Sequence, residues 1–176
     1  MQAKRMLTIA ITGVLIAVGG TAISAQDRYM LQVPNGLAFA EFKGYESWPV
    51  VAVSQTGETI EVILANPVMI TAYQAGAPGN GQPFPDGSKM AKIHWNAIKS
   101  ADAPAPTMVP GTLHDVDFMV RDSKRFPDSA AWGYAEFDYD TASETFKPIG
   151  SGSNCGHACH TIAAKKDYVF TTYPKR

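Results

Sequence analysis

The sequence predicts an α+β fold that is dominated by antiparallel β-sheet and contains only a few short helices. Apolar and polar residues alternate over several short runs, which is the pattern of a strand with one buried face. Segments rich in Gly and Pro separate these runs, in a chain with 15 glycines and 12 prolines. Such segments are typical of turns between strands. The length of 176 residues suits a single domain of ordinary size.

Five runs carry the strand pattern. In the clearest of them, DVDFMVR, the residues Val116, Phe118 and Val120 face one way and the intervening residues face the other. The run ETIEVIL is a strand by residue type, because β-branched side chains favour extended backbone. The expected strands cover residues 49–53, 58–64, 89–95, 115–121 and 132–139.

Helices are expected only as short connections. Asn66 followed by Pro67 fits an N-cap and the first position of a helix that runs to about residue 74. A second short helix is expected at 161–167. Residues 27–40 show no clear period and are expected to wrap the surface. The other loops are expected at 75–88, 100–110 and 141–153.

The first 25 residues have the organisation of a secretory signal peptide. Lys4 and Arg5 precede an apolar stretch at residues 6–18, and small residues up to Ala25 provide a cleavage site. We therefore expect export to the periplasm and a mature domain of residues 26–176, with no membrane association after cleavage. An uncleaved membrane anchor is the alternative, although the apolar stretch is short.

The charge of the chain bears on its partners. The net charge is −1, and removal of the leader takes away two basic residues and no acidic one, which leaves −3. A domain that binds nucleic acid needs a basic surface. Nucleic acid is therefore excluded as the expected partner.

Both cysteines lie in one short motif, NCGHACH at residues 154–160. Two thiols followed by an imidazole are what covalent haem attachment requires. Each thiol adds to a vinyl group of the haem, and the histidine becomes an iron ligand. The usual spacing is C-x-x-C-H, and this motif is one residue longer. The loop closes if the extra residue bulges outward, and Gly156 would ease the strain.

The motif alone leaves three other interpretations open. In an exported protein, Cys155 and Cys159 can form a small-loop disulfide. Together with His157 and His160 they can also be read as a zinc site, although four ligands within six residues would be cramped. Free, buried thiols are the third possibility.

Several further stretches of the sequence resemble the cytochrome P-460 family, which also includes the cytochromes c′-beta. The resemblance runs from about Tyr45 to Pro174. The matching stretches are VRDSKRF at 120–126, WGY at 132–134, the segment from Cys159 to Pro174, and FPDG at 84–87 followed by Lys92.

The resemblance implies a small periplasmic homodimer, largely β-sheet, with one five-coordinate haem c that is open on one side. In the P-460 cytochromes a lysine is also bonded to the porphyrin. These proteins oxidise hydroxylamine to nitric oxide or nitrous oxide, and a soluble cytochrome c is the natural electron acceptor. The cytochromes c′-beta lack the lysine bond and bind nitric oxide. The expected function is therefore hydroxylamine oxidation, with nitric oxide binding as the alternative.

The resemblance also assigns residues to the haem. It gives Cys155 and Cys159 to the thioether bonds and His160 to the iron. It places Lys92 at the cross-linking position. Lys89 is the alternative if the register of the strand is shifted. A solvated strand lysine is the ordinary interpretation of Lys92.

Polar residues near the expected ligand site follow from the same resemblance. Asp117 falls where family members can place an acid/base group, and a buried carboxylate with a raised pKa would take protons from hydroxylamine. An exposed strand carboxylate is the ordinary interpretation. Glu61 stands where related sequences can carry arginine, so it would change the electrostatics around the ligand. His94 and His114 are expected at the surface or on a polar face, with a role near the ligand open for either.

Overall fold

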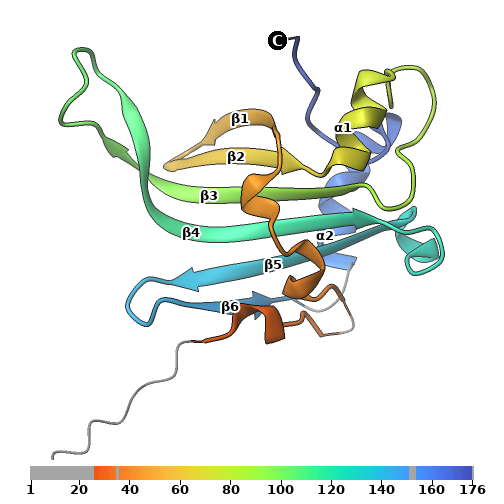
Figure 1. Cartoon of the computed structure of the whole chain (residues 1–176), viewed down its shortest axis with the longest axis horizontal. Coiled ribbons are helices and arrows are strands. Elements are labelled where there is room, and N and C mark those ends of the chain that lie inside the picture. The colour runs from red at the N-terminus through yellow and green to blue at the C-terminus, as the bar shows by residue number, and fades with distance from the viewer. Residues whose placement is uncertain (1–25, 35, 151–153, 176) are drawn as a thin grey trace, which may run out of the picture.

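The computed structural model describes residues 26–34, 36–150 and 154–175, without the side chains of residues 154 and 155. The expected signal peptide lies outside these residues. Six antiparallel strands form one sheet in sequence order, so each strand pairs with its neighbours along the chain (Figure 1). The strands are β1 (Val50–Thr56), β2 (Thr59–Ala65), β3 (Lys89–Lys99), β4 (Met108–Arg121), β5 (Trp132–Asp140) and β6 (Thr145–Ile149).

The helices are short, as the sequence predicts. The α-helices are α1 (Pro67–Gln74) and α2 (Asn154–His160), and the 3-10 helices are η1 (Arg28–Met30), η2 (Phe39–Phe42), η3 (Tyr45–Ser47), η4 (Pro127–Ser129) and η5 (Thr161–Lys166). The side chain of Asn66 caps α1 by accepting the Met69 N–H at 3.1 Å. Within the described residues, no helix is long and apolar enough to cross a membrane. The predicted α+β class, mostly antiparallel sheet, is confirmed.

The N-terminal segment covers one face of the sheet. Phe39 and Phe42 from η2 pack against Phe118 of β4, with ring centroids 5.1 and 4.2 Å apart. Val33 and Leu37 are also buried. The prediction that residues 27–40 wrap the surface is therefore wrong, because Val33, Leu37 and Phe39 are buried in the core on this face of the sheet.

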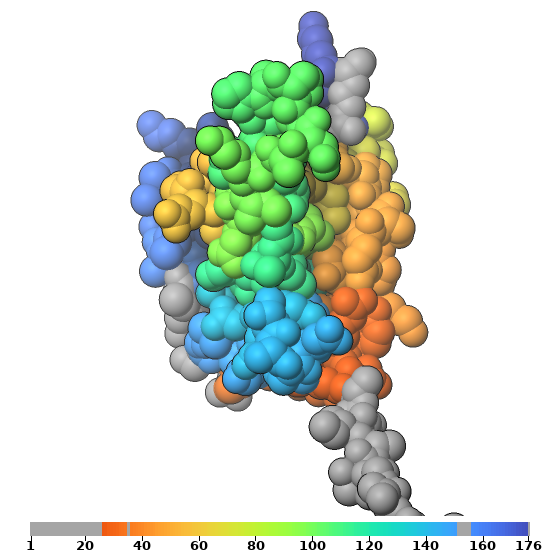
Figure 2. Space-filling view, turned by 90° about the vertical axis from the view of Figure 1, so that its left-hand side faces the viewer, coloured from red at the N-terminus to blue at the C-terminus, as the bar shows by residue number. Residues whose placement is uncertain are grey.

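The C-terminal segment and α1 cover the other face. Figure 2 shows the sheet between the red and orange N-terminal segment and the blue C-terminal segment. Met90, Met119 and Trp132 project from β3, β4 and β5 into a second core together with Val169. Beyond this apolar core, the same face of the sheet carries charged side chains.

The turns that join these layers account for the family-like motifs. The carboxylate of Asp86 in FPDG accepts the Ser123 hydroxyl at 2.5 Å and the Ser123 N–H at 3.1 Å. Phe126 lies so close to Gly133 that a Cβ atom there would meet its ring at 2.4 Å. Asp86, Ser123, Phe126 and Gly133 therefore hold the scaffold.

Candidate functional site

An open cavity of about 550 Å³ lies between the charged face of the sheet and α2 with the C-terminal segment. Four of the predicted site residues, Lys92, Asp117, Cys159 and His160, line this cavity. The fifth, Cys155, belongs to α2, but its side chain lies outside the described part of the chain. The volume lies within the range of about 300–1,000 Å³ that is usual for ligand and cofactor pockets.

The cysteine motif is helical, and the extra residue does not bulge. Residues 154–160 form α2 without interruption, so positions 155 and 159 are one turn apart along the helix. Residues four apart in a helix lie on the same face, as do residues three apart. The C-x-x-x-C spacing therefore also places positions 155 and 159 on one side of the helix. Cys159 is an exposed, free thiol at the cavity.

Gly156 lets this helix lie against β5. A Cβ atom at position 156 would come within 2.5 Å of Cβ and Cγ of Tyr134. Such a distance is closer than carbon atoms approach without moving apart. The glycine inside the motif thus sets the depth at which Cys159 and His160 reach the cavity.

His160 is held in one tautomer by the backbone. Its Nδ1 lies 2.6 Å from the carbonyl oxygen of Tyr168, which can only accept, so Nδ1 carries the proton. Burial lowers the pKa of His160, so the ring is neutral near pH 7. The rings of Tyr134 and Phe170 lie 4.8 and 4.7 Å from the imidazole. Nε2 is then the unprotonated nitrogen, as in histidines that bind metal.

The Tyr168 carbonyl is itself fixed by a strained turn. Asp167 and Tyr168 have positive φ angles of 51° and 62°, which non-glycine residues adopt rarely. The carboxylate of Asp167 accepts the Phe84 N–H at 2.8 Å and contacts Arg121 at 3.3 Å. These bonds hold the turn and thereby orient the imidazole of His160.

Cross-strand pairing gathers ionisable residues on the sheet wall of the cavity. Lys92 on β3 pairs with Asp117 on β4. Two residues further along β3, on the same face, His94 pairs with Asp115. Because directly opposite residues share a face, all four point the same way. Glu61 on β2 pairs with His94, and Glu136 on β5 pairs with Asp117.

Lys92 forms an ion pair with Glu61. Its Nζ lies 3.2 Å from Oε2 of Glu61, which also accepts the Ser54 hydroxyl at 2.5 Å. Burial would raise the pKa of Glu61, but the hydrogen bond from Ser54 and the charge of Lys92 outweigh it and lower the pKa to about 2. Lys89 lies on the opposite face and donates to the Glu41 carbonyl at 2.6 Å. Lys92, and not Lys89, is therefore the lysine of this strand that lines the cavity.

Asp117 presents a carboxylate to the cavity. Its side chain is 40 % exposed there, and its Oδ2 lies 4.0 Å from Nδ1 of His94. Burial and the neighbouring charge of Asp115 raise the pKa of Asp117 to about 7. A carboxyl group with this pKa is divided between its acid and base forms near neutral pH, which is the range a general base needs.

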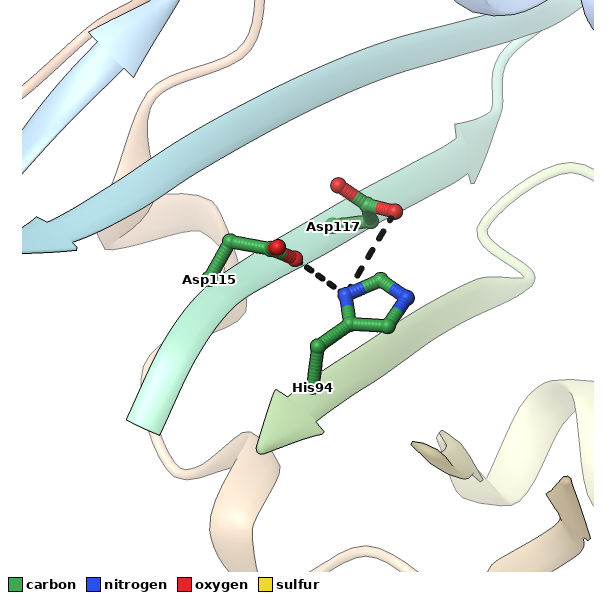
Figure 3. Close-up of side chains that lie close together, drawn as sticks. All are labelled: His94, Asp115 and Asp117. Carbon is green, nitrogen blue, oxygen red and sulfur yellow. Dashed lines mark hydrogen bonds and ion pairs between the residues drawn. The ribbon is translucent and has the colours of Figure 1, made fainter. Parts of the chain in front are cut away.

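His94, for which the sequence left a role near the ligand open, lies next to the cavity residue Asp117. It lies on the polar face of the sheet, which was one of the two expected positions, but it is not a surface residue, because its side chain is only 10 % exposed. Figure 3 shows His94 on β3 pointing toward Asp115 and Asp117 on β4, with Nδ1 hydrogen-bonded to Asp115. The signal that would have found it is the cross-strand register, which period-2 alternation does not provide.

A model of the cytochrome P460 family matches residues 42–171. The chain belongs to the cytochrome P460 family. A search of curated proteins finds no match. The matched region contains all six strands, α2 and the cavity. Membership of the cytochrome P460 family implies a haem cofactor and bears out the resemblance seen in the sequence.

The residues of the cavity fit that cofactor. The neutral imidazole of His160, with Nδ1 engaged by a backbone carbonyl, suits an axial iron ligand. The thiol of Cys159 directly precedes it and lies at the same cavity. Ile63, Met90 and Val169 add apolar surface for a macrocycle. These observations favour haem over the zinc interpretation, which would need both histidines and both thiols as ligands.

Proposed function

We propose that this member of the cytochrome P460 family is an exported haem c protein that oxidises hydroxylamine. One observation carries the proposal: the carboxylate of Asp117 lines the same cavity as the imidazole of His160. The raised pKa of Asp117 agrees with a role in proton transfer. Oxidation of hydroxylamine releases protons, and a site for it needs an acceptor. Export and a homodimer belong to the same proposal and are supported by the signal-like leader and the family resemblance.

Each residue has a role in this proposal. The haem, when bound, supplies an iron that binds hydroxylamine and accepts electrons. His160 would hold the iron through Nε2, and Cys155 and Cys159 would anchor the macrocycle. Asp117 takes protons from the substrate. Conversion of hydroxylamine to nitric oxide releases three protons and three electrons, and the electrons pass to a soluble cytochrome c. Nitrous oxide is the product when two substrate molecules combine.

Lys92 is the residue proposed to bond to the porphyrin edge. The bond replaces one N–H of the amine and one C–H of the ring, so two electrons and two protons leave. A peroxide can take up the two electrons and the two protons as it is reduced to water. Such a bond distorts the macrocycle, which is one way in which a protein changes the reactivity of the iron.

Nitric oxide binding without turnover is the second candidate, and the Lys92–Glu61 ion pair favours it. A lysine held as an ammonium has no lone pair with which to bond to carbon. Met90 and Met119 also make part of the cavity apolar. A protein without the lysine bond would retain an ordinary haem c spectrum.

Mass spectrometry of the tryptic holoprotein separates the two candidates. We expect the peptide with Lys92 to remain attached to haem together with the Cys159 peptide, and the ferrous Soret band to lie far to the red. Lys92→Leu should restore an ordinary c-type spectrum and abolish hydroxylamine oxidation. Lys89→Leu is the matched control, because Lys89 lies on the other face of the same strand and should change neither property.

The opposite result is equally clear. A free Lys92 peptide, an ordinary spectrum and no turnover in the wild-type holoprotein would refute the oxidase proposal. Reversible nitric oxide binding by the same sample would then support the second candidate.

A further inference from the structure

A chain of titratable side chains leads from the cavity wall to solvent. Asp117 lines the cavity, and its Oδ2 lies 4.0 Å from Nδ1 of His94. The same nitrogen is hydrogen-bonded to Oδ1 of Asp115, and Oδ2 of Asp115 is hydrogen-bonded to Nδ1 of His114. The side chains of His94 and Asp115 are each 10 % exposed, whereas that of His114 is 52 % exposed. This series of side chains therefore begins at the cavity and ends in water (Figure 3 shows its inner three members).

We propose that these four residues form a proton exit path, through which protons released in the cavity leave the protein. Asp117 is the entrance, His94 and Asp115 are the buried relay, and His114 is the exit. The inference rests on the proposed hydroxylamine oxidation, because that reaction is what supplies the protons. His94 and Asp115 act through Asp117 and do not touch the substrate, so they are positioning residues.

The transfer balances without any electron. At rest, Nδ1–H of His94 donates to Asp115. That proton moves to Asp115 and then through His114 to water, and Nδ1 next takes the proton that Asp117 accepted from the substrate. The 4.0 Å gap between Asp117 and His94 is longer than a hydrogen bond. A side-chain rotation or one bridging water closes it.

Neighbouring groups shift the pKa values of the relay residues. Burial alone would lower the pKa of His94, but the hydrogen bond and charge of Asp115 raise it. The pKa of Asp117 is raised to about 7 by burial and by Asp115. The hydrogen bonds from His94 and His114 outweigh burial and lower the pKa of Asp115, so Asp115 holds the proton only in passing. The other ionisable groups that act on this pair are Glu61 on β2, Lys92 on β3 and Glu136 on β5.

A divalent cation is the competing occupant. Ligand atoms of His94, Asp115 and Asp117 all lie within 4.8 Å of one another. The structure favours the proton path because Asp115 already bonds to a second histidine, His114, which extends the cluster toward solvent. A metal site would need no such exit.

The first test compares kcat, KM and the solvent isotope effect for hydroxylamine oxidation by the holoprotein. His94→Asn retains a donor to Asp115 but cannot pass a proton on. Because a positioned acid or base contributes about 10²–10⁴-fold, we expect kcat to fall about tenfold or more. KM should stay unchanged, and the solvent isotope effect should increase. Asp128→Asn is the matched control: Asp128 is an exposed carboxylate in η4 and does not belong to the path, so kcat should remain within about twofold. A wild-type rate and isotope effect in His94→Asn would overturn the proposal.

The second test needs no turnover. NMR of the ferrous carbonyl holoprotein, which is diamagnetic, follows the carboxyl carbon of Asp117 and the ring nitrogens of His94 with pH. We expect Asp117 to titrate in two coupled steps in the wild type and in one step in His94→Asn. Independent single titrations in the wild type would overturn the path, as would a stoichiometric non-haem metal that is lost in His94→Asn. If the wild type does not oxidise hydroxylamine, the proposed function fails, and this titration still decides whether the four residues exchange protons.

Discussion

Asp117 stands at the boundary between the apolar and the charged part of the cavity wall. Along the same face of β4, the next residue toward the C-terminal end is Met119, which belongs to the apolar core. The next residue toward the N-terminal end is Asp115, which belongs to the charged part of the wall. The carboxylate therefore lies beside the apolar core and within the field of a second negative charge, Asp115, and both raise its pKa. One residue thus links the packing of the sheet to the chemistry of the cavity.

This position gives a first prediction, on activity. Asp117→Asn removes the base while keeping the size and polarity of the side chain. Hydroxylamine oxidation should slow by about a hundredfold, a typical loss for a general base. In the wild type, kcat should rise with pH as Asp117 deprotonates around pH 7, and the variant should lose this step. Steady-state kinetics between pH 5 and about pH 9 measure both effects, and the haem spectrum checks that the site is intact. An unchanged rate would identify Asp117 as a solvated strand residue.

The same substitution should have the opposite effect on stability. The folded-state pKa of Asp117 is raised above its unfolded value, so the folded protein binds the proton more tightly than the unfolded chain does. That contribution is fully present below the unfolded pKa and is lost as the pH rises through about 7. Asp117→Asn should therefore raise the melting temperature at alkaline pH and leave it nearly unchanged at pH values near 4. Thermal unfolding of both proteins at the two pH values tests the sign.

At the scale of elements, alternation and turn residues were sufficient for the five strands that cross the core and for α1. They failed where local signals are weak. Thr145–Ile149 contains Pro148, and a proline argues against a strand except at an edge, which is where β6 lies. The extension of β4 to Met108 has the same cause, since Pro110 lies within it. α2 was missed because glycine and cysteine are poor helix formers, and only its packing on β5 explains the helix.

The packing of α2 leads to a second prediction. Gly156→Ala would normally favour a helix by about 0.5–1 kcal/mol, but here the added Cβ meets Tyr134 at 2.5 Å. Overpacking of this kind costs about 1–3 kcal/mol, so the variant should be less stable and should incorporate less haem. Ala158→Gly is the control, because Ala158 is exposed in the same helix and should lose only helix propensity. Haem content per chain and thermal unfolding are the measurements. A more stable Gly156→Ala protein with full haem content would show that α2 has room to move.

For the molecule as a whole, the sheet separates two layers of different kinds. The N-terminal layer packs on the sheet through a continuous aromatic core of Phe39, Phe42, Phe118 and Phe137. The C-terminal layer spans a cavity of about 550 Å³ and is held at its ends by the Asp167 turn and by α2. The alternation in the sequence could predict which face of the sheet packs against the N-terminal layer. It could not predict the cavity, because that space depends on where residues more than 60 apart along the chain, such as Lys92 and His160, come together.

This asymmetry gives the last prediction. Without haem, the cavity lacks the apolar surface that would fill it, so α2 and residues 167–173 should open at a lower free energy than the sheet and the N-terminal layer. In hydrogen exchange followed by mass spectrometry, a Cys155→Ala/Cys159→Ala protein that lacks haem should exchange rapidly in those two segments and slowly in β3 and β4. The holoprotein should protect all of them, because a ligand that binds only the folded state stabilises it. Uniform loss of protection across both layers in the haem-free protein would contradict this view. It would mean that the sheet and the aromatic core do not fold until the haem is in place.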